Sequence, residues 1–428
     1  MKDPFHKALA QAIGKEATLG TIARPLSTSR RSFTKRNAPP FPGEPLTLQL
    51  VEGEDHLDWE EIPAIVPGLR QAKRGASGLS SEGTTTLQFA RLAPSEIGKL
   101  LEQTDRKLTP RRGLRRWNHE SKKLEDVAPG NKPILLFIHG TFSNGDNFFK
   151  SLLGTDHGKQ LLEDAVGKYR GEVYSFDHPT LSVSPLLNAL DLQQSLSRHT
   201  SQIDFVAHSR GGLVARWWLH LFDPSGDRCR QAILVGSPMA GTSLAAPPNI
   251  RNAIKQLTSY GKILSETSKV ASFAVPCLAV VHALLRVLTS VSSLASNTPL
   301  ADAAIGLVPG LCGQSRVGNS PELSRLQSSS LAKEDRFHAI LSNFESSAIG
   351  WRFWKAFRKE YVADSLTDWL FNGPNDLVVD CESMTQITDQ HRLPKSRCLD
   401  FGTNEDVHHI NYFDFEKTSA FLSKVLKL

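Results

Sequence analysis

The hydrophobic pattern changes along the chain. From Pro133 onward, short apolar runs alternate with longer segments of helical spacing. Such runs are typical of buried strands in a parallel sheet, and the segments between them of crossover helices. Six runs fit this description: 134–138 (ILLFI), 173–176 (VYSF), 203–207 (IDFVA), 232–236 (AILVG), 337–341 (FHAIL) and 398–401 (CLDF). The pattern predicts an α/β fold with a doubly wound, mostly parallel sheet.

The interval between the fourth and fifth runs is too long for a simple crossover connection. It contains the apolar stretch 270–295, which is long enough to span a membrane but is interrupted by Pro276, His282 and Arg286. We expect a helical lid or cap at about residues 245–330, with this stretch as a buried or lid helix. The aromatic and basic segment 351–371 has helical spacing and predicts a packed cap helix, with a lipid-facing helix as the alternative.

The part of the chain before the alternating pattern has a different character. Residues 1–43 are basic and rich in Ser and Pro, which predicts a flexible tail. Residues 44–130 form an N-terminal extension in which LTLQLVEG and TTTLQFARL predict leading strands. The charged segment 105–126 predicts an exposed helix or loop. The expected catalytic domain is therefore 131–428.

Charge and composition narrow the functional class. With 40% hydrophobic and 22% charged residues, the chain has the composition of a soluble globular protein. Residues 1–36 hold eight Lys and Arg against two acidic residues, a surplus that equals the formal net charge of +6. The remainder is formally neutral, which argues against a nucleic-acid-binding surface. A basic terminus that contacts an anionic membrane remains the alternative to a solvated one.

The cysteines indicate a reducing compartment. They are five in number, widely spaced and without a C-x-x-C pair: Cys229, Cys277, Cys312, Cys381 and Cys398. This pattern favours free thiols in a cytoplasmic protein over a disulfide framework or a zinc site, and leaves open a single bridge between Cys381 and Cys398. The N-terminus lacks the apolar run of a secretory signal peptide. We expect a cytoplasmic location, with peripheral membrane contact through the lid or the basic N-terminus as an alternative.

The strongest chemical signal is a serine between a strand and a helix. The run 203–207 leads directly into AHSRGGLVAR, where Ser209 is flanked by the small residues Ala207 and Gly211. A tight strand-to-helix turn of this kind exposes a nucleophilic hydroxyl, and small residues two positions before and after it relieve crowding. An ordinary turn is the competing interpretation. We predict that Ser209 is a nucleophile.

A second signal is the sequence His139-Gly140-Thr141 after the first apolar run. Acyl transfer needs two backbone N–H groups directed at the tetrahedral oxyanion, one from the residue after the nucleophile and one from a loop after an earlier strand. The amides of Arg210 and Thr141 are the candidates.

Several motifs in order resemble the lipase-like branch of the α/β-hydrolases, which includes bacterial lipases, lecithin-cholesterol-acyltransferase-like enzymes and GPI-inositol-deacylase-like proteins. They are FIHGTF, VYSFDHPTLSVSP, FVAHSRGGLVAR, LVGSPMAGTSLA, PNDLVV and VHHINYF. The resemblance covers about residues 133–428 and implies an α/β-hydrolase fold. PNDLVV resembles the segment that carries the acid, which implies Asp376; Asp380, Asp364 and Asp368 compete.

The motif VHHINYF follows the last strand, where the family keeps its histidine. The resemblance implies His409 as general base, with His408 left to pack or to contact product and Asp406 as a residue that could tune it. The implied function is hydrolysis of carboxylic esters, lipid or other acyl esters above all, without metal or cofactor. Two alternatives stay open: a phospholipase, deacylase, thioesterase or acyltransferase on the same triad, and a non-catalytic interaction or effector module.

Overall fold

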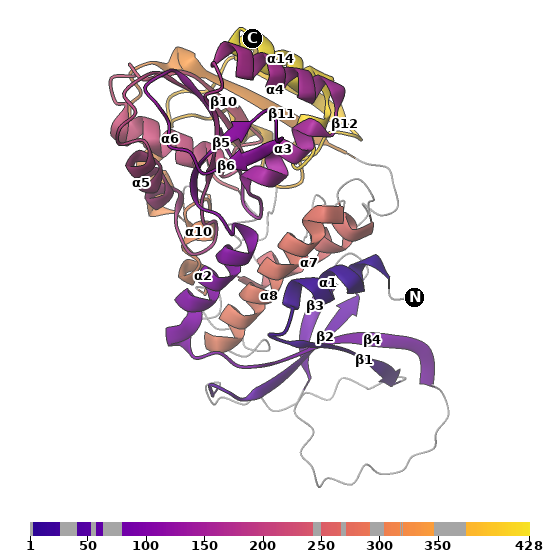
Figure 1. Cartoon of the computed structure of the whole chain (residues 1–428). Coiled ribbons are helices and arrows are strands. Elements are labelled where there is room, and N and C mark those ends of the chain that lie inside the picture. The colour runs from indigo at the N-terminus through magenta and orange to yellow at the C-terminus, as the bar shows by residue number, and fades with distance from the viewer. Residues whose placement is uncertain are drawn as a thin grey trace. The chain divides into compact units, whose positions relative to one another are not determined.

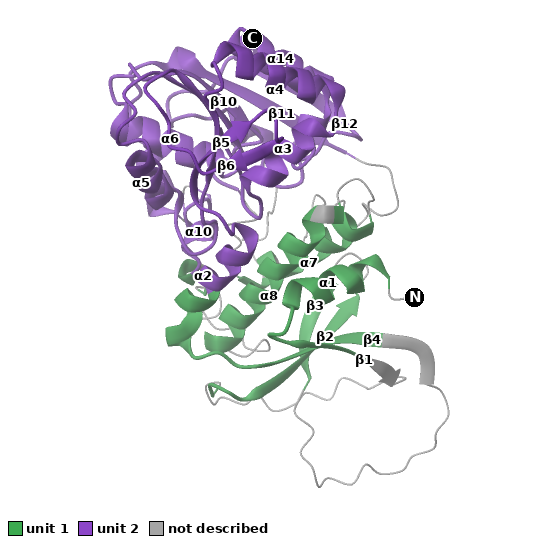
Figure 2. Ribbon diagram, viewed as in Figure 1, with its two compact units in different colours: residues 1–100, 248–307 green, residues 101–247, 308–428 purple. Residues whose placement is uncertain are grey.

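The computed structural model describes residues 3–25, 41–52, 57–62, 79–242, 250–266, 271–291, 304–316, 318, 320–345 and 374–428. The chain splits into two compact units (Figures 1 and 2). Unit 1 consists of residues 1–100 and 248–307, and unit 2 of residues 101–247 and 308–428. The predicted cap helix at 351–371 lies outside the described residues.

Unit 2 is built on an eight-stranded sheet with the order β12-β11-β10-β9-β7-β8-β5-β6. The strands from β12 to β8 pair in parallel, and β5 and β6 are antiparallel. The predicted mostly parallel sheet and all six of its strands are confirmed. The bounds are β5 (Gly113–Asn118), β6 (Lys123–Glu125), β7 (Ile134–Ile138), β8 (Val173–Asp177), β9 (Ile203–His208), β10 (Cys229–Val235), β11 (Phe337–Phe344) and β12 (Cys398–Asn404).

Helices cover both faces of this sheet, which explains why β7 is apolar at every position. Side chains alternate along a strand, so Leu135 and Phe137 join one core and Ile134, Leu136 and Ile138 the other. The first core includes α3 (Gly145–Leu153), α4 (Asp156–Lys168) and α14 (Glu416–Leu426); the second includes α5 (Pro185–Ser195) and α6 (Gly211–Phe222). The short helices α10 (Pro309–Cys312), α11 (Pro321–Gln327) and α13 (Cys381–Thr385) also belong to unit 2.

The charged segment 105–126 differs from the prediction of an exposed helix or loop. It contains the end of α2 (Ile97–Leu108) and the β5–β6 hairpin, which extends the large sheet. Trp117 is buried and its ring stacks on Phe149. Arg115 is also buried. Ion pairing of Arg115 explains how so charged a strand enters the sheet. With the hairpin included, unit 2 begins at residue 101, whereas the sequence predicted a boundary at about 130.

Unit 1 contains an antiparallel sheet of order β1-β4-β2-β3, with helices α1 (Pro4–Ile13), α7 (Ile250–Glu266) and α8 (Ala274–Val291). Its strands are β1 (Thr18–Pro25), β2 (Pro45–Glu52), β3 (Leu57–Ile62) and β4 (Leu79–Ala90), so the two leading strands predicted in 44–130 are present. The prediction of a tail over 1–43 is wrong for residues 4–25. There, Asp3 caps α1, and Phe5, Leu9 and Ile13 form a buried stripe that the basic composition concealed.

The described residues of the insertion expected at 245–330 divide between the two units: α7 and α8 belong to unit 1, and residues from 308 onward belong to unit 2. Helices α7 and α8 pack against each other and against α1. Among the described helices, α8 is long and apolar enough to cross a membrane, a test that the core helix of a soluble protein also passes. Most of α8 is buried within the structure.

All five cysteines are free thiols, so the structure does not form the Cys381–Cys398 bridge that the sequence left open. The Cys381 thiol faces the carbonyl oxygen of Ser342 at 3.2 Å, and that of Cys398 faces Pro394 O at 3.5 Å.

Candidate active site

Ser209 occupies a sharp turn between β9 and α6. Its φ of +53° lies in the left-handed region, which non-glycine residues rarely adopt. The turn is held on both sides: Ser209 N donates to Val235 O of β10 (2.8 Å), and Gly212 N donates to Ser209 O (2.9 Å). The hydroxyl is therefore fixed beside the N-terminus of α6, where the helix dipole favours negative charge.

Glycines allow the turn to pack closely on its neighbours. A Cβ on Gly211 would lie 2.4 Å from Ile138 O of β7, and a Cβ on Gly212 would lie 2.3 Å from Ser237 Oγ. The small residue predicted at 211 is thus needed because β7 touches it, and not only because of crowding between positions 207 and 211. Ala207 lies in β9 and is fully buried.

His409 links the serine to a carboxylate. The Ser209 hydroxyl faces His409 Nε2 at 2.8 Å, and His409 Nδ1 faces Asp376 Oδ2 at 2.8 Å. Since a carboxylate only accepts, Nδ1 carries the proton and Nε2 is free to accept from the serine. All three side chains are buried. The structure brings together the three residues that the resemblance implied.

Asp376 is held in place through both of its oxygens. Oδ1 accepts from the backbone N–H groups of Val378 (3.1 Å) and Val379 (2.9 Å), and Oδ2 also accepts from the Tyr412 hydroxyl (2.9 Å). His409 N in turn donates to Asp376 O (3.0 Å). These bonds orient the carboxylate toward the imidazole.

The competing acid Asp380 has different surroundings. It pairs with Arg316 at 3.3 Å, and burial raises the pKa of its carboxyl to about 6. Asp364 and Asp368 lie outside the described residues.

Two further histidines lie close to His409 without occupying its position. The His408 ring packs edge-on against Phe344, and burial lowers its pKa to about 4. His208 directs Nε2 at the backbone oxygen of His409 (2.7 Å), so this nitrogen must be the donor. Burial lowers the pKa of His208 to about 3. Asp406, the other residue considered there, is exposed.

The loop after β7 approaches the serine closely. A Cβ on Gly140 would lie 2.6 Å from Ser209 Cβ, so only glycine fits there. In the described part of the chain, the backbone N–H groups of Thr141 and Arg210 donate to no protein acceptor. The hydroxyl of Thr141 bonds with the Gln314 amide. Neither predicted oxyanion donor thus uses its amide within the described residues, and Gly140, the residue before Thr141, lies against Ser209.

The Arg210 side chain points away into the protein. Its Nη2 donates to Val183 O at 2.5 Å, and the guanidinium is fully buried. Burial lowers its pKa to about 10, against the opposing effect of Asp105 and Glu322. Within the described ranges, no three His, Cys, Asp or Glu side chains gather as metal ligands would.

A family model described as Domain of unknown function (DUF7379) matches residues 105–427, which is well over half of the chain. The chain belongs to the DUF7379 family. The match begins in α2 and includes the β5–β6 hairpin, so the DUF7379 region contains the complete eight-stranded sheet and every candidate site residue. Residues before 105, which supply the sheet of unit 1, lie outside it.

Comparison with solved structures gives distant likenesses, while no curated protein matches the sequence. The chain is similar to the mature lipase BlEst2 from Bacillus licheniformis (15% identity, 71% of this chain, 94% of that chain, TM-score 0.35). It is also similar to EstA from Clostridium botulinum (13% identity, 77% of this chain, 98% of that chain, TM-score 0.41). A third similar structure is lipase 1 from Pelosinus fermentans (13% identity, 70% of this chain, 100% of that chain, TM-score 0.42). The α/β-hydrolase fold of this DUF7379 member follows from its strand order and its serine turn.

Proposed function

We propose that this protein is a serine hydrolase that cleaves carboxylic esters through an acyl-enzyme intermediate. The observation that carries the proposal is the continuous series from Ser209 Oγ through the His409 imidazole to Asp376, with 2.8 Å at each contact. Nucleophile, base and orienting acid within hydrogen-bond reach are the geometric signature of this chemistry.

In the proposed reaction, Ser209 Oγ attacks the acyl carbonyl and His409 Nε2 takes the serine proton. Asp376 holds the tautomer that leaves Nε2 free and stabilises the imidazolium that forms. The backbone N–H groups of Thr141 and Arg210 donate to the oxyanion of the tetrahedral intermediate. His409 then protonates the leaving alcohol. Water, activated by the same imidazole, attacks the acyl-enzyme and releases the acid.

The proposed substrates are lipid or other acyl esters, a class that the lipase-like sequence motifs suggest. We further propose a cytoplasmic location, supported by the free thiols. Peripheral membrane contact is the alternative, and co-sedimentation with anionic phosphatidylserine vesicles against neutral phosphatidylcholine vesicles would distinguish the two.

The decisive experiment is labelling with a fluorophosphonate probe, followed by peptide mapping. We expect covalent modification at Ser209, loss of labelling in Ser209→Ala, and normal labelling in the control Ser197→Ala, which alters an exposed serine. A non-catalytic module would not react. Esters of increasing acyl chain length, tested with and without an alcohol acceptor, would then separate hydrolysis from acyl transfer by the products formed.

A further inference from the structure

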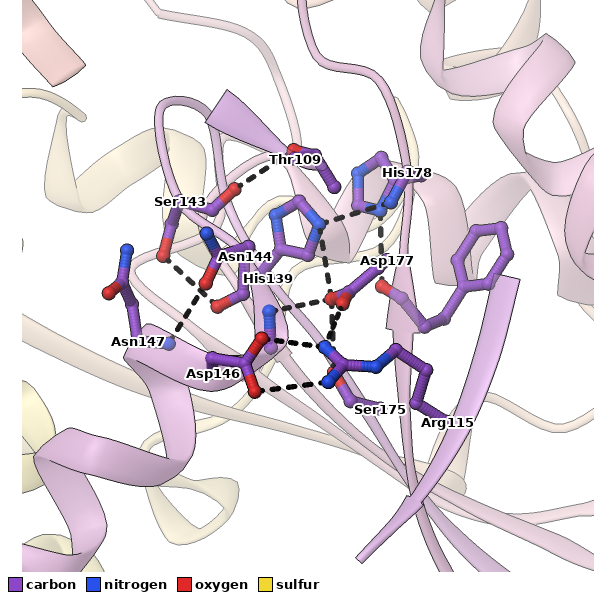
Figure 3. A network of polar contacts seen from close by, with 12 residues as sticks. Thr109, Arg115, His139, Ser143, Asn144, Asp146, Asn147, Ser175, Asp177 and His178 are labelled. Atoms are coloured by element: carbon purple, nitrogen blue, oxygen red, sulfur yellow. Dashed lines mark hydrogen bonds and ion pairs between the residues drawn. The ribbon is translucent and has the colours of Figure 1, made fainter. Parts of the chain in front are cut away.

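A cluster of charged side chains, Arg115, Asp146 and Asp177, lies at one end of the loop 140–144, which contains Thr141 (Figure 3). Arg115 of β5 donates from Nη1 to Asp177 Oδ2 at the end of β8 (2.8 Å) and to Asp146 Oδ2 in the first turn of α3 (2.7 Å). Its Nη2 reaches the second oxygen of Asp146 (3.1 Å) and Leu124 O (3.0 Å). One guanidinium therefore joins two strands to the helix that follows the loop.

The cluster is built into the protein interior. The side chains of Arg115 and Asp177 are 2% and 1% exposed, whereas that of Asp146 is 57% exposed. The two carboxylates raise the pKa of Arg115 despite its burial. The contact between Arg115 and Asp177 holds a fixed geometry, because breaking it would leave two buried charges unpaired. Asp146 and, at 3.7 Å, Asp126 face the same guanidinium from the exposed side.

The α3 end of the loop is fixed by the same groups. Gly145 N donates to the other oxygen of Asp177 (2.6 Å), and a Cβ on Gly145 would lie 2.3 Å from Ser175 Oγ. Asn144, which caps α3, donates from Nδ2 to Leu108 O (2.9 Å). The chain thus leaves the loop at a point that β8, α2 and the Arg115 cluster define together.

The other end of the loop is fixed by two histidines. His139 accepts from His178 N (3.2 Å) through Nε2, and the two rings stack with centroids 4.1 Å apart. Because Nε2 of His139 accepts this bond, that ring is neutral. Burial lowers the pKa of both rings. Gly140 then contacts Ser209 directly. Five residues, 140–144, span these two anchors, and Thr141 lies among them.

We propose that Arg115 is a positioning residue for the reaction. By joining Asp177 to Asp146, it holds the loop 140–144 in the position from which the Thr141 amide can donate to the oxyanion. This inference rests on the proposed function. Arg115 touches neither the nucleophile nor the base. Its effect is on the transition state, because an oxyanion donor matters most after the carbonyl has become tetrahedral.

Arg336→Met is a matched control for Arg115→Met. Arg336 is 3% exposed and bonds Asp223, which is 1% exposed, at 2.9 Å. Asp223 also accepts from the backbone of Cys229, at the start of β10. The control pair therefore lies at the amino end of β10, whereas Ser209 follows the carboxyl end of β9.

The experiment compares kcat and KM for a p-nitrophenyl ester, inhibition by a trifluoromethyl ketone of matching acyl chain, and thermal midpoints. We expect Arg115→Met to lower kcat by about 10- to 100-fold, with KM within about twofold and inhibitor affinity falling in parallel with kcat/KM. Arg115→Lys should restore part of kcat. Arg336→Met should lower the thermal midpoint by a similar amount and leave kcat nearly unchanged.

Equal losses of kcat in both Met variants, or an effect of Arg115→Met on KM alone, would overturn the proposal. If Arg115→Met does not fold, Asp146→Asn replaces it, since Asp146 is half exposed and Arg115 keeps Asp177. A several-fold loss of kcat in Asp146→Asn would support the proposal, and unchanged kcat would overturn it. Failure of the wild-type protein to react at Ser209 is a separate result, which refutes the proposed function itself.

Discussion

Replacing Asp376 with asparagine would invert the hydrogen bonds at one carboxylate oxygen, Oδ2, which accepts from His409 and from the Tyr412 hydroxyl. Oδ1 accepts two backbone N–H groups, from Val378 and Val379, so the amide oxygen of an asparagine must take that place. The amide nitrogen then occupies the position of Oδ2, 2.8 Å from His409 Nδ1. An amide nitrogen only donates, which forces the imidazole to accept at Nδ1 and to carry its proton on Nε2.

The changed tautomer directs a proton at Ser209 Oγ and removes the base. We expect Asp376→Asn to lower kcat by about 10⁴-fold, the loss seen when a triad acid is changed this way. Because asparagine is nearly isosteric with aspartate and keeps the two backbone bonds, the fold should persist. The assay is ester hydrolysis together with the rate of fluorophosphonate labelling and a thermal midpoint.

Asp380→Asn is the matched control, four residues away in the same segment. Its carboxyl pairs with Arg316 rather than with an imidazole. We expect kcat to stay within about threefold of wild type, since exposed or half-buried pairs contribute little. If Asp380→Asn abolished turnover while Asp376→Asn retained it, the assignment of the acid would be wrong, and with it the tautomer argument.

Three further variants test the surroundings of the serine. Gly140→Ala should lower kcat by at least about 100-fold, because the new Cβ would lie 2.6 Å from Ser209 Cβ, and soluble, folded protein with normal turnover would contradict this. Tyr412→Phe removes one donor to Asp376 Oδ2 and should lower kcat by about tenfold, an effect of 1.5 kcal/mol or so for a bond to a charged group, read from steady-state kinetics. His208→Gln should make the protein less sensitive to acid: the pKa of His208 is about 3 in the folded state, so the unfolded chain takes up the proton first and stability is lost as pH falls below about 6.5. Between neutral pH and pH 5, the variant should lose about 2 kcal/mol less unfolding free energy than the wild type in urea titrations. If the unfolding free energies of the two proteins fell in parallel with pH, the low pKa of His208 would be refuted.

The sequence predicted those parts of the structure whose cause is local. Each buried strand of the large sheet is a continuous apolar run, and the turn at Ser209 needs small residues that can be seen in the letters AHSRGG. The edge hairpin was missed because Arg115 looks like a surface residue until its partners, Asp146 and Asp177, are known. Those partners are 31 and 62 positions away, and no pattern within one strand indicates them.

The same distinction applies to the candidate site. Ser209 was found from its own turn, whereas Asp376 and His409 needed the resemblance of whole motifs, because a lone Asp or His carries no local signature. Tyr412 had a faint signal, since it lies three residues after His409 in VHHINYF, but its bond to the carboxylate depends on the fold. His208 stands beside the nucleophile in the sequence, and only the structure shows that it holds the backbone of His409.

Taken together, these contacts make the proposed site depend on backbone positions as well as on the three reactive side chains. His208 and Asp376 each bond the main chain of His409, and Gly140 and Arg115 define the two ends of the oxyanion loop. Variants at such supporting positions should therefore lower kcat while leaving the Ser–His–Asp side chains present. A set of supporting variants with wild-type kcat and lowered stability would instead indicate that the site tolerates backbone movement, and the Arg115 proposal would fail with it.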